Sequence, residues 1–182
     1  MVFCDTIYDS ELDYQETFDI MACISYYRRV NKLDPLTYPV VQTIAETIYQ
    51  ETLKCGGDAL LIAAIIAQES QFKPTAVSRA GAKGLMQIMP KYHNITNGDY
   101  FDIKANITKG VELFYQWHQE FQEVPLTLAA YNAGPTLVRR LKRIPNIRET
   151  RRYINSVLHN YEMFKNVIAS QDLVTEQIIQ EG

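Results

Sequence analysis

The stretch ALLIAAIIAQESQFKP, residues 59–74, decides how this chain must fold. Its side chains are apolar almost without interruption up to Ala67, and a helix that is apolar nearly all round belongs at the centre of a domain. Asp58 precedes the stretch as an N-cap residue, so we expect a helix over residues 59–70. This central helix would carry a single carboxylate, Glu69, at its C-terminal end.

Helical spacing of apolar residues continues along most of the chain, and strand-like alternation is nearly absent. Residues 75–98 are the exception, because glycines and a proline interrupt them, and we expect a loop with short helical pieces there. One further helix should begin after Pro39, present Val41, Ile44, Ile48 and Cys55 on one stripe, and end at Gly56. The remaining helices are expected over residues 10–30, 103–122, 126–131, 136–142 and 148–169. The predicted fold class is therefore all-α.

The overall charge limits the partners that the protein can have. With 182 residues the chain is about one domain long, and its net charge of −3 argues against general binding to nucleic acid. The charge is unevenly distributed. The first twenty residues are acidic, with Asp5, Asp9, Glu11, Asp13, Glu16 and Asp19. A later segment is basic, with Arg139, Arg140, Lys142, Arg143, Arg148, Arg151 and Arg152, which is typical of a solvated face or of attraction to an anionic polymer.

The cysteines and the N-terminus indicate where the protein is made. Cys4, Cys23 and Cys55 have neither disulfide nor metal-ligand spacing, so we expect free thiols, no metal and no cofactor. The first residues lack the basic and apolar regions of a secretory signal. No apolar run reaches the ~18–20 residues of a membrane span. We therefore expect synthesis in the cytoplasm without a signal peptide and no membrane-spanning segment.

Glu69 has two reasons to hold its proton near neutral pH. Apolar neighbours such as Ile65 and Ile66 desolvate the carboxylate, and the C-terminal end of a helix carries partial negative charge that opposes ionisation. Both effects raise the pKa of Glu69. A carboxylic acid that stays neutral is suited to protonating a glycosidic oxygen, which is the general-acid step of glycoside cleavage.

A second carboxylate, which most glycosidases require, is absent near Glu69 in the sequence. Residues 70–98 contain no Asp or Glu, and Asp58 lies about 16 Å away along the same helix. Asp99, Asp102 and Glu149 qualify only if folding brings them close. The simplest scheme therefore lets a hydroxyl of the substrate act as the nucleophile, because a well-oriented intramolecular attack has a very large effective molarity.

Several motifs closely resemble the soluble type of lytic transglycosylase, within the goose-type lysozyme-like superfamily, and the similarity spans roughly residues 40–161. They are Gln68-Glu69-Ser70, PTAVS at 74–78, GAKGLMQIMP at 81–90, AAYNAGP at 129–135 and ETRRY at 149–153. The resemblance implies a lysozyme-like helical domain that cleaves the β-1,4 bond between N-acetylmuramic acid and N-acetylglucosamine in peptidoglycan. The product would be a 1,6-anhydromuramoyl end, which agrees with the single-carboxylate scheme.

The resemblance also assigns roles to the first two motifs. Glu69 matches the catalytic acid and base, and Ser70 matches a serine that hydrogen-bonds near the muramoyl group, with a local helix cap as the alternative for Ser70. Met86 and Gln87 match residues that line the saccharide cleft, although a methionine at this spacing is more often part of a core. Tight turns at Gly81 and Gly84 would let the backbone approach the sugar closely.

The later motifs supply the expected surroundings of Glu69. Tyr131 and Asn132 match residues that border the cleft beside the catalytic acid. Tyr153 matches a tyrosine whose hydroxyl lies near that acid and orients it. For each tyrosine the alternative is a core residue whose hydroxyl is satisfied elsewhere.

Three segments are expected: a helical extension over residues 1–36, the catalytic domain over 37–170 and a polar tail over 171–182. Family members without an export signal include phage enzymes and proteins delivered by specialised machines. We therefore expect a virion-associated wall-opening enzyme acting at the bacterial cell wall, with the N-terminal helix docking on a virion or secretion-machine protein. A mature bacterial enzyme that has lost its signal is the alternative.

Two other functions fit the same sequence features. A goose-type lysozyme would share the fold but use water, with Asp99 or Asp102 assisting. A non-catalytic wall-binding or structural protein would keep the cleft without needing the acid.

Overall fold

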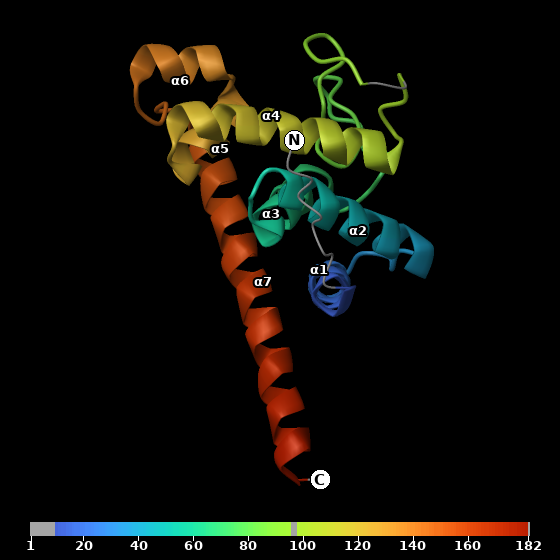
Figure 1. Cartoon of the computed structure of the whole chain (residues 1–182). Helices are drawn as coiled ribbons and strands as arrows, with labels where there is room; N and C mark the ends of the chain where they lie inside the picture. The colour runs from blue at the N-terminus through green and yellow to red at the C-terminus, as the bar shows by residue number, and fades with distance from the viewer. Residues whose placement is uncertain (1–9, 96–97, 182) are drawn as a thin grey trace, which may run out of the picture.

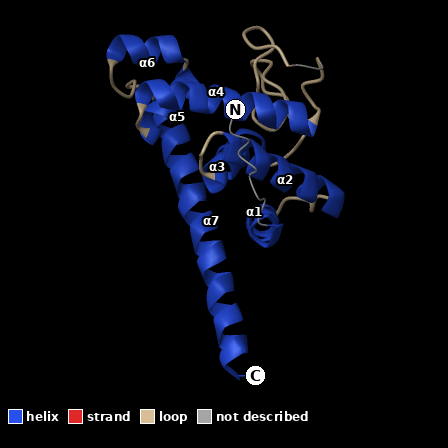
Figure 2. Cartoon of the chain, in the orientation of Figure 1, coloured by secondary structure: helices blue, strands red, loops and turns tan. Residues whose placement is uncertain are grey.

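The computed structural model describes residues 10–95 and 98–181 and confirms the all-α fold class. Figure 1 shows the arrangement of the helices, and Figure 2 shows that loops alone connect them in the described part of the chain. The helices are α1 (Ser10–Val30), α2 (Tyr38–Lys54), α3 (Ala59–Ser70), α4 (Ile103–Phe121), α5 (Val124–Ala133), α6 (Pro135–Leu141) and α7 (Arg148–Glu181).

Helix α3 lies at the centre, as its composition predicts. The side chain of Asp58 accepts hydrogen bonds from the backbone N–H groups of Leu60 and Leu61, which confirms the predicted N-cap. Every residue from Leu61 to Ala67 is buried, and α3 packs against α1, α2 and α7. The helix ends where Gln71 adopts a left-handed conformation with φ of 54°. This ending places Glu69 in the last turn of α3, at the edge of the core.

Helix α1 belongs to the same core. Ile20 and Ile24 are fully buried, and the Tyr27 hydroxyl donates a hydrogen bond of 3.0 Å to the Ala67 carbonyl in α3. The Tyr27 ring meets the rings of Phe72 and Phe164 edge-on, with centroids 5.7 and 6.2 Å away. The segment predicted as an extension thus packs on both the helix that carries Glu69 and the last helix.

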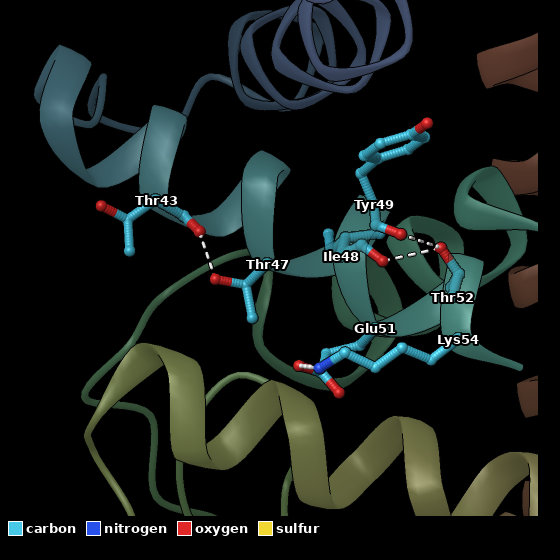
Figure 3. A network of polar contacts seen from close by, with 7 residues as sticks. All are labelled: Thr43, Thr47, Ile48, Tyr49, Glu51, Thr52 and Lys54. Atoms are coloured by element: carbon cyan, nitrogen blue, oxygen red, sulfur yellow. Dashed lines mark hydrogen bonds and ion pairs between the residues drawn. The ribbon is translucent and has the colours of Figure 1, made fainter. Parts of the chain in front are cut away.

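Helix α2 begins at Tyr38, one residue before Pro39, and its threonines bond to carbonyls one turn back (Figure 3). The Thr47 hydroxyl donates to the Thr43 carbonyl and the Thr52 hydroxyl to the Ile48 carbonyl, at 2.6 and 2.7 Å. These bonds let hydroxyl groups stay buried in a helix that faces the core.

The stripe predicted for α2 is right for three of its four members. Val41, Ile44 and Ile48 are buried, whereas Cys55 is exposed, because α2 ends at Lys54 and Cys55 lies in the turn that follows. Among the described cysteines Cys23 and Cys55 are free thiols, and Cys4 lies outside the described residues, as do the acidic Asp5 and Asp9.

The last helix is longer than the sequence predicts. A helix over residues 148–169 was expected, but α7 continues to Glu181 because no glycine or proline interrupts the chain before Gly182. Figure 1 shows α7 extending well beyond the other helices. None of the helices described has the length and apolar character that crossing a bilayer requires.

Candidate active site

Glu69 lines an open cleft at the end of α3. The cleft has a volume of about 550 Å³ and lies between α3, the end of α5 and the start of α7. The Glu69 side chain is partly buried, and this burial raises its pKa from 4.5 to about 7. A hydrogen bond from Tyr153 opposes the shift without cancelling it. The carboxyl group therefore keeps its proton to a much higher pH than an ordinary glutamate does.

The hydroxyl of Tyr153 lies beside the carboxyl group of Glu69, where the resemblance places it. This hydroxyl donates a hydrogen bond of 2.8 Å to Oε1 of Glu69 from a buried position in the second turn of α7. Burial and the nearby charge of Glu69 raise the pKa of Tyr153 well above its usual value, so this hydroxyl stays a donor. Within the described residues no hydrogen bond uses Oε2 of Glu69, which leaves that oxygen available to a substrate.

Tyr131 lies near Glu69 but its hydroxyl is directed to the glycine-rich loop. That hydroxyl donates a hydrogen bond of 2.9 Å to the Met86 carbonyl. Burial, and then the charge of Glu69, raise the pKa of Tyr131 well above its usual range. The Tyr131 ring meets Trp117 edge-on with centroids 5.6 Å apart. Tyr131 is not among the residues that line the Glu69 cleft, and its contact with a substrate stays a prediction.

Met86 is fully buried, and its sulfur packs against Gly110 in α4. Its carbonyl accepts from Tyr131 and its N–H donates to Asn106, so Met86 fits the core alternative, and its contact with a substrate stays a prediction. Gln87 has a positive φ of 50°, and its side-chain amide donates hydrogen bonds to the carbonyls of Gly84 and Ala76. Gln87 therefore fixes the turn of the loop.

Asn106 of α4 holds this loop in place. Its Oδ1 accepts from the Met86 N–H at 2.8 Å, and its Nδ2 donates to the carbonyls of Lys83 and Tyr100 at 3.0 and 2.9 Å. Gly84, with φ of +77°, lies against the Asn106 side chain, where a Cβ atom would come within 2.3 Å of Nδ2. The predicted close approach of Gly84 is therefore to the protein's own asparagine.

Asn132 and Ser70 differ in their exposure to the cleft. Asn132 lines it, and its Oδ1 accepts a hydrogen bond of 2.8 Å from the Thr150 hydroxyl of α7. Ser70 is buried, and its hydroxyl donates to the Ile66 carbonyl one turn back at 3.2 Å. This bond fits the local alternative for Ser70, and its contact with a substrate stays a prediction.

Asn132 also lines a second hollow of about 750 Å³, so the two hollows meet at this residue. The second hollow lies between the glycine-rich loop, α4 and α5, with Trp117 and Tyr131 in its wall. We refer to these two adjoining hollows together as the groove; Glu69 lines the first of them. The Glu69 cleft is lined by Gln68, Glu69, Asn132, Arg148, Glu149, Arg152, Tyr153 and Ser156.

Most carboxylates considered as partners of Glu69 bind backbone N–H groups at helix ends or in a turn. Asp58 caps α3, Asp102 caps α4 through the Ala105 N–H, and Asp99 accepts from the Phe101 N–H. Only Glu149 lines the Glu69 cleft. The raised pKa of Glu69 nevertheless comes from its burial and not from a neighbouring carboxylate.

Sequence reasoning missed residues that support the site. Asn106 is a buried polar residue beside the apolar Ile107 of α4, a position that signals a hydrogen-bonding role. Thr150 precedes Tyr153 by three residues, so both side chains share one face of α7, and this spacing could have revealed it. Arg148 and Arg152 were noted only as part of a basic segment.

The all-α fold, with the partly buried Glu69 in an open cleft, narrows the class of protein to which this chain can belong. The sequence profile of the Transglycosylase SLT domain family matches residues 46–154, more than half of the chain. The chain belongs to this family.

Three known proteins show the extent of the similarity. A "Membrane-bound lytic murein transglycosylase F" of Desulfosudis oleivorans is 30% identical over 87% of this chain and 37% of its own length. A "Transglycosylase" of Enterobacteria phage PRD1 is 34% identical over 49% of this chain and 34% of its own length. The crystal structure of the 70 kDa soluble lytic transglycosylase of Escherichia coli matches with a TM-score of 0.62 and 25% identity, covering 87% of this chain and 29% of that one. The chain thus spans about a third of the length of these proteins.

Proposed function

We propose that this protein is a peptidoglycan lytic transglycosylase that cleaves the β-1,4 bond between N-acetylmuramic acid and N-acetylglucosamine. The observation that carries the proposal is the carboxyl group of Glu69, which has a pKa of about 7, a single side-chain hydrogen bond and a position in an open groove. Family membership and the lytic transglycosylase names of relatives support the choice of substrate.

The reaction needs one acid that works twice. Protonated Glu69 donates its proton to the glycosidic oxygen while the bond from that oxygen to C1 of the muramoyl residue breaks. The muramoyl C6 hydroxyl attacks C1, and its proton passes to the Glu69 carboxylate. The new C1–O6 bond closes the 1,6-anhydro ring, and Glu69 is again protonated. Tyr153 stabilises the carboxylate that exists between the two transfers.

Mass spectrometry of digested peptidoglycan tests this proposal. Purified peptidoglycan treated with the protein should yield anhydromuramoyl ends, which are lighter by one water than hydrolysed ends. Reducing ends alone would contradict transglycosylation. Glu69→Gln should lower kcat by about 10²–10⁴-fold, since general acid–base catalysis typically contributes that much. Unchanged activity of Glu69→Gln would point instead to another catalytic group.

Hydrolysis is the second candidate, and Glu149 is the observation in its favour, because this carboxylate lines the same cleft. An inverting hydrolase keeps its two carboxyl groups about 6.5–9.5 Å apart so that a water fits between them. If Glu149 activates water, Glu149→Gln should abolish reducing ends. If the enzyme is a transglycosylase, the same variant should keep forming anhydro ends. If the protein only binds the wall, the wild type and Glu69→Gln should bind peptidoglycan equally well, and neither should cleave it.

We further propose that the protein acts at the bacterial cell wall after delivery by a virion or a secretion machine, with α1 as the docking element. Two observations support this: Tyr14 and Phe18 of α1 are 78% and 59% exposed, and one relative is a phage protein. If the proposal holds, Tyr14→Ser with Phe18→Ser should reduce the protein in purified particles without changing its cleavage of peptidoglycan. Undiminished incorporation would exclude this surface.

A further inference from the structure

Two arginines at the Glu69 cleft form no ion pair with any side chain in the described part of the chain. Arg148 and Arg152 lie one turn apart on α7, are exposed, and line the same cleft as Glu69. The ion pairs found among the described residues involve other side chains. Glu149 lies between the two arginines in the sequence and also lines the cleft, yet it pairs with neither.

Other arginines of the same basic segment have an ordinary structural setting. Arg139 and Arg140 lie in the last turn of α6, where the helix dipole favours a cation. Arg139 also binds both oxygens of Glu120, at 2.6 and 2.7 Å. Arg148, in contrast, is the first residue of α7, where the dipole opposes a cation. Functional sites are where a residue is expected to go against such a preference, here the preference against a cation at a helix N-terminus.

We propose that Arg148 and Arg152 bind carboxylates of the short peptide carried by the lactyl group of muramic acid, so that they favour stem-bearing glycan over bare glycan. This inference rests on the proposed function, because Glu69 would act at the muramoyl residue and the peptide is attached to that same sugar. A guanidinium is well suited to the task, since its planar N–H groups match a carboxylate in a bidentate pair.

Among the described residues, unpaired positive charge does not continue into the hollows on either side of the Glu69 cleft. Lys109 lines the second hollow, but it forms an ion pair of 3.0 Å with Glu112. A further hollow of about 410 Å³ adjoins the Glu69 cleft and shares Gln68 and Ser156 with it. Its described lining includes Asn31, Asn155 and Asn160 but no lysine or arginine. Neutral amides suit uncharged sugar or backbone groups, so carboxylate recognition is assigned to the two arginines.

The test compares two substrates and two variants. Soluble glycan strands are used with their peptide stems and after an amidase has removed the stems. In Arg148→Gln with Arg152→Gln, the ratio of kcat/KM for stem-bearing over bare strands should fall about tenfold, mainly through KM, because hydrogen bonds between charged groups are lost. Arg140→Gln with Arg143→Gln removes the same charge from the same basic segment and should leave that ratio unchanged.

An unchanged kcat/KM ratio in the cleft variant, or an equal fall of this ratio in the control variant, would overturn the arginine site. So would a fall in kcat/KM that depends on phosphate polymers attached to the strands and not on the peptide stems. Titration calorimetry with a soluble stem peptide measures the site without catalysis, and the cleft variant should bind this peptide about tenfold more weakly than the wild type. Equal binding would likewise overturn it. Wild-type protein that cleaves neither substrate would refute the proposed function, and the titration would still decide on the arginines.

Discussion

The hydroxyl of Tyr153 stabilises the charged form of Glu69, so its removal has a predictable sign. Tyr153→Phe deletes the one interaction that lowers the pKa of Glu69 and should raise this pKa above about 7. The alkaline limb of the kcat/KM profile should therefore move to higher pH, because the acid stays protonated longer. At the optimum we expect kcat to fall about tenfold, since the carboxyl group loses its orienting bond.

A matched control is Tyr161→Phe, which removes a tyrosine hydroxyl that bonds to Asp58 at the other end of α3. Its pH profile should coincide with that of the wild type. An alkaline limb that stays in place in Tyr153→Phe, or moves to lower pH, would contradict the role given to the Tyr153 hydroxyl.

Glu69 should also make the stability of the protein depend on pH. Its folded pKa of about 7 exceeds its ordinary value of 4.5, so the folded state binds the proton more tightly than the unfolded chain. The stability from this group is full below pH 4.5 and is lost as pH rises through about 7. The Glu69→Gln side chain stays neutral at every pH, so this variant should be more stable than the wild type at pH 8, by on the order of 3 kcal/mol.

Urea unfolding of the two proteins at pH 4.5 and pH 8 measures this difference. The two free energies of unfolding should be similar at the lower pH and diverge at the higher one. A Glu69→Gln protein that is less stable than the wild type at pH 8 would show that the Glu69 carboxylate is stabilised in the fold, contrary to its raised pKa.

At the scale of elements, the glycine-rich loop is held by one asparagine of α4, and two glycines allow a test of this. Gly84 and Gly81 both have positive φ, but only at Gly84 would a Cβ meet other atoms, namely Asn106 Nδ2 and the Tyr100 carbonyl. Gly81→Ala should lower stability by about 1–2 kcal/mol through backbone strain alone. Gly84→Ala should lose a further ~1–3 kcal/mol from overpacking and raise KM, because the loop shifts. Equal effects in thermal unfolding would contradict the close packing.

The sequence predicts the elements well where the signal is local. The start of α3 follows from Asp58, and the burial of α2 follows from the spacing of Val41, Ile44 and Ile48. Predictions fail where no local signal exists. The end of α7 lacks a breaker before Gly182, and the exposure of Cys55 depends on where α2 stops.

At the scale of the whole molecule, α1 contributes to the core as much as to any docking surface. Its Ile20, Cys23, Ile24 and Tyr27 are buried against other helices, and burial of such side chains is worth about 1.5–3 kcal/mol each. Deletion of residues 1–36 should therefore remove most of a typical stability of about 5–15 kcal/mol.

Circular dichroism measures this directly. The protein without residues 1–36 should show weak, non-cooperative thermal unfolding. The C-terminal end of α7 extends beyond the other helices (Figure 1). Deletion of residues 171–182 should therefore keep the Tm within a few degrees of the wild type. A cooperative transition near the wild-type Tm after the N-terminal deletion would show that residues 37–182 fold alone.

The candidate site shows why motifs predict a catalytic residue better than its surroundings. Glu69 and Tyr153 are 84 positions apart, and their hydrogen bond was expected only because a related family has the same two motifs. No resemblance pointed to Asn106, and Arg148 and Arg152 became part of the cleft only when α7 packed on α3. Long-range packing of this kind leaves no periodic trace in the sequence.

Helix α7 lines the Glu69 cleft at its N-terminal end and extends beyond the other helices at its C-terminal end (Figure 1). A helix of 34 residues is about 50 Å long, and Tyr153 lies in its second turn. A reporter or module fused after the last residue would thus be held tens of ångströms from the reacting bond by a stiff spacer rather than a flexible tether. Lengthening α7 by whole turns should increase the distance between a fused group and the Glu69 cleft by about 5.4 Å per turn, with little change of direction.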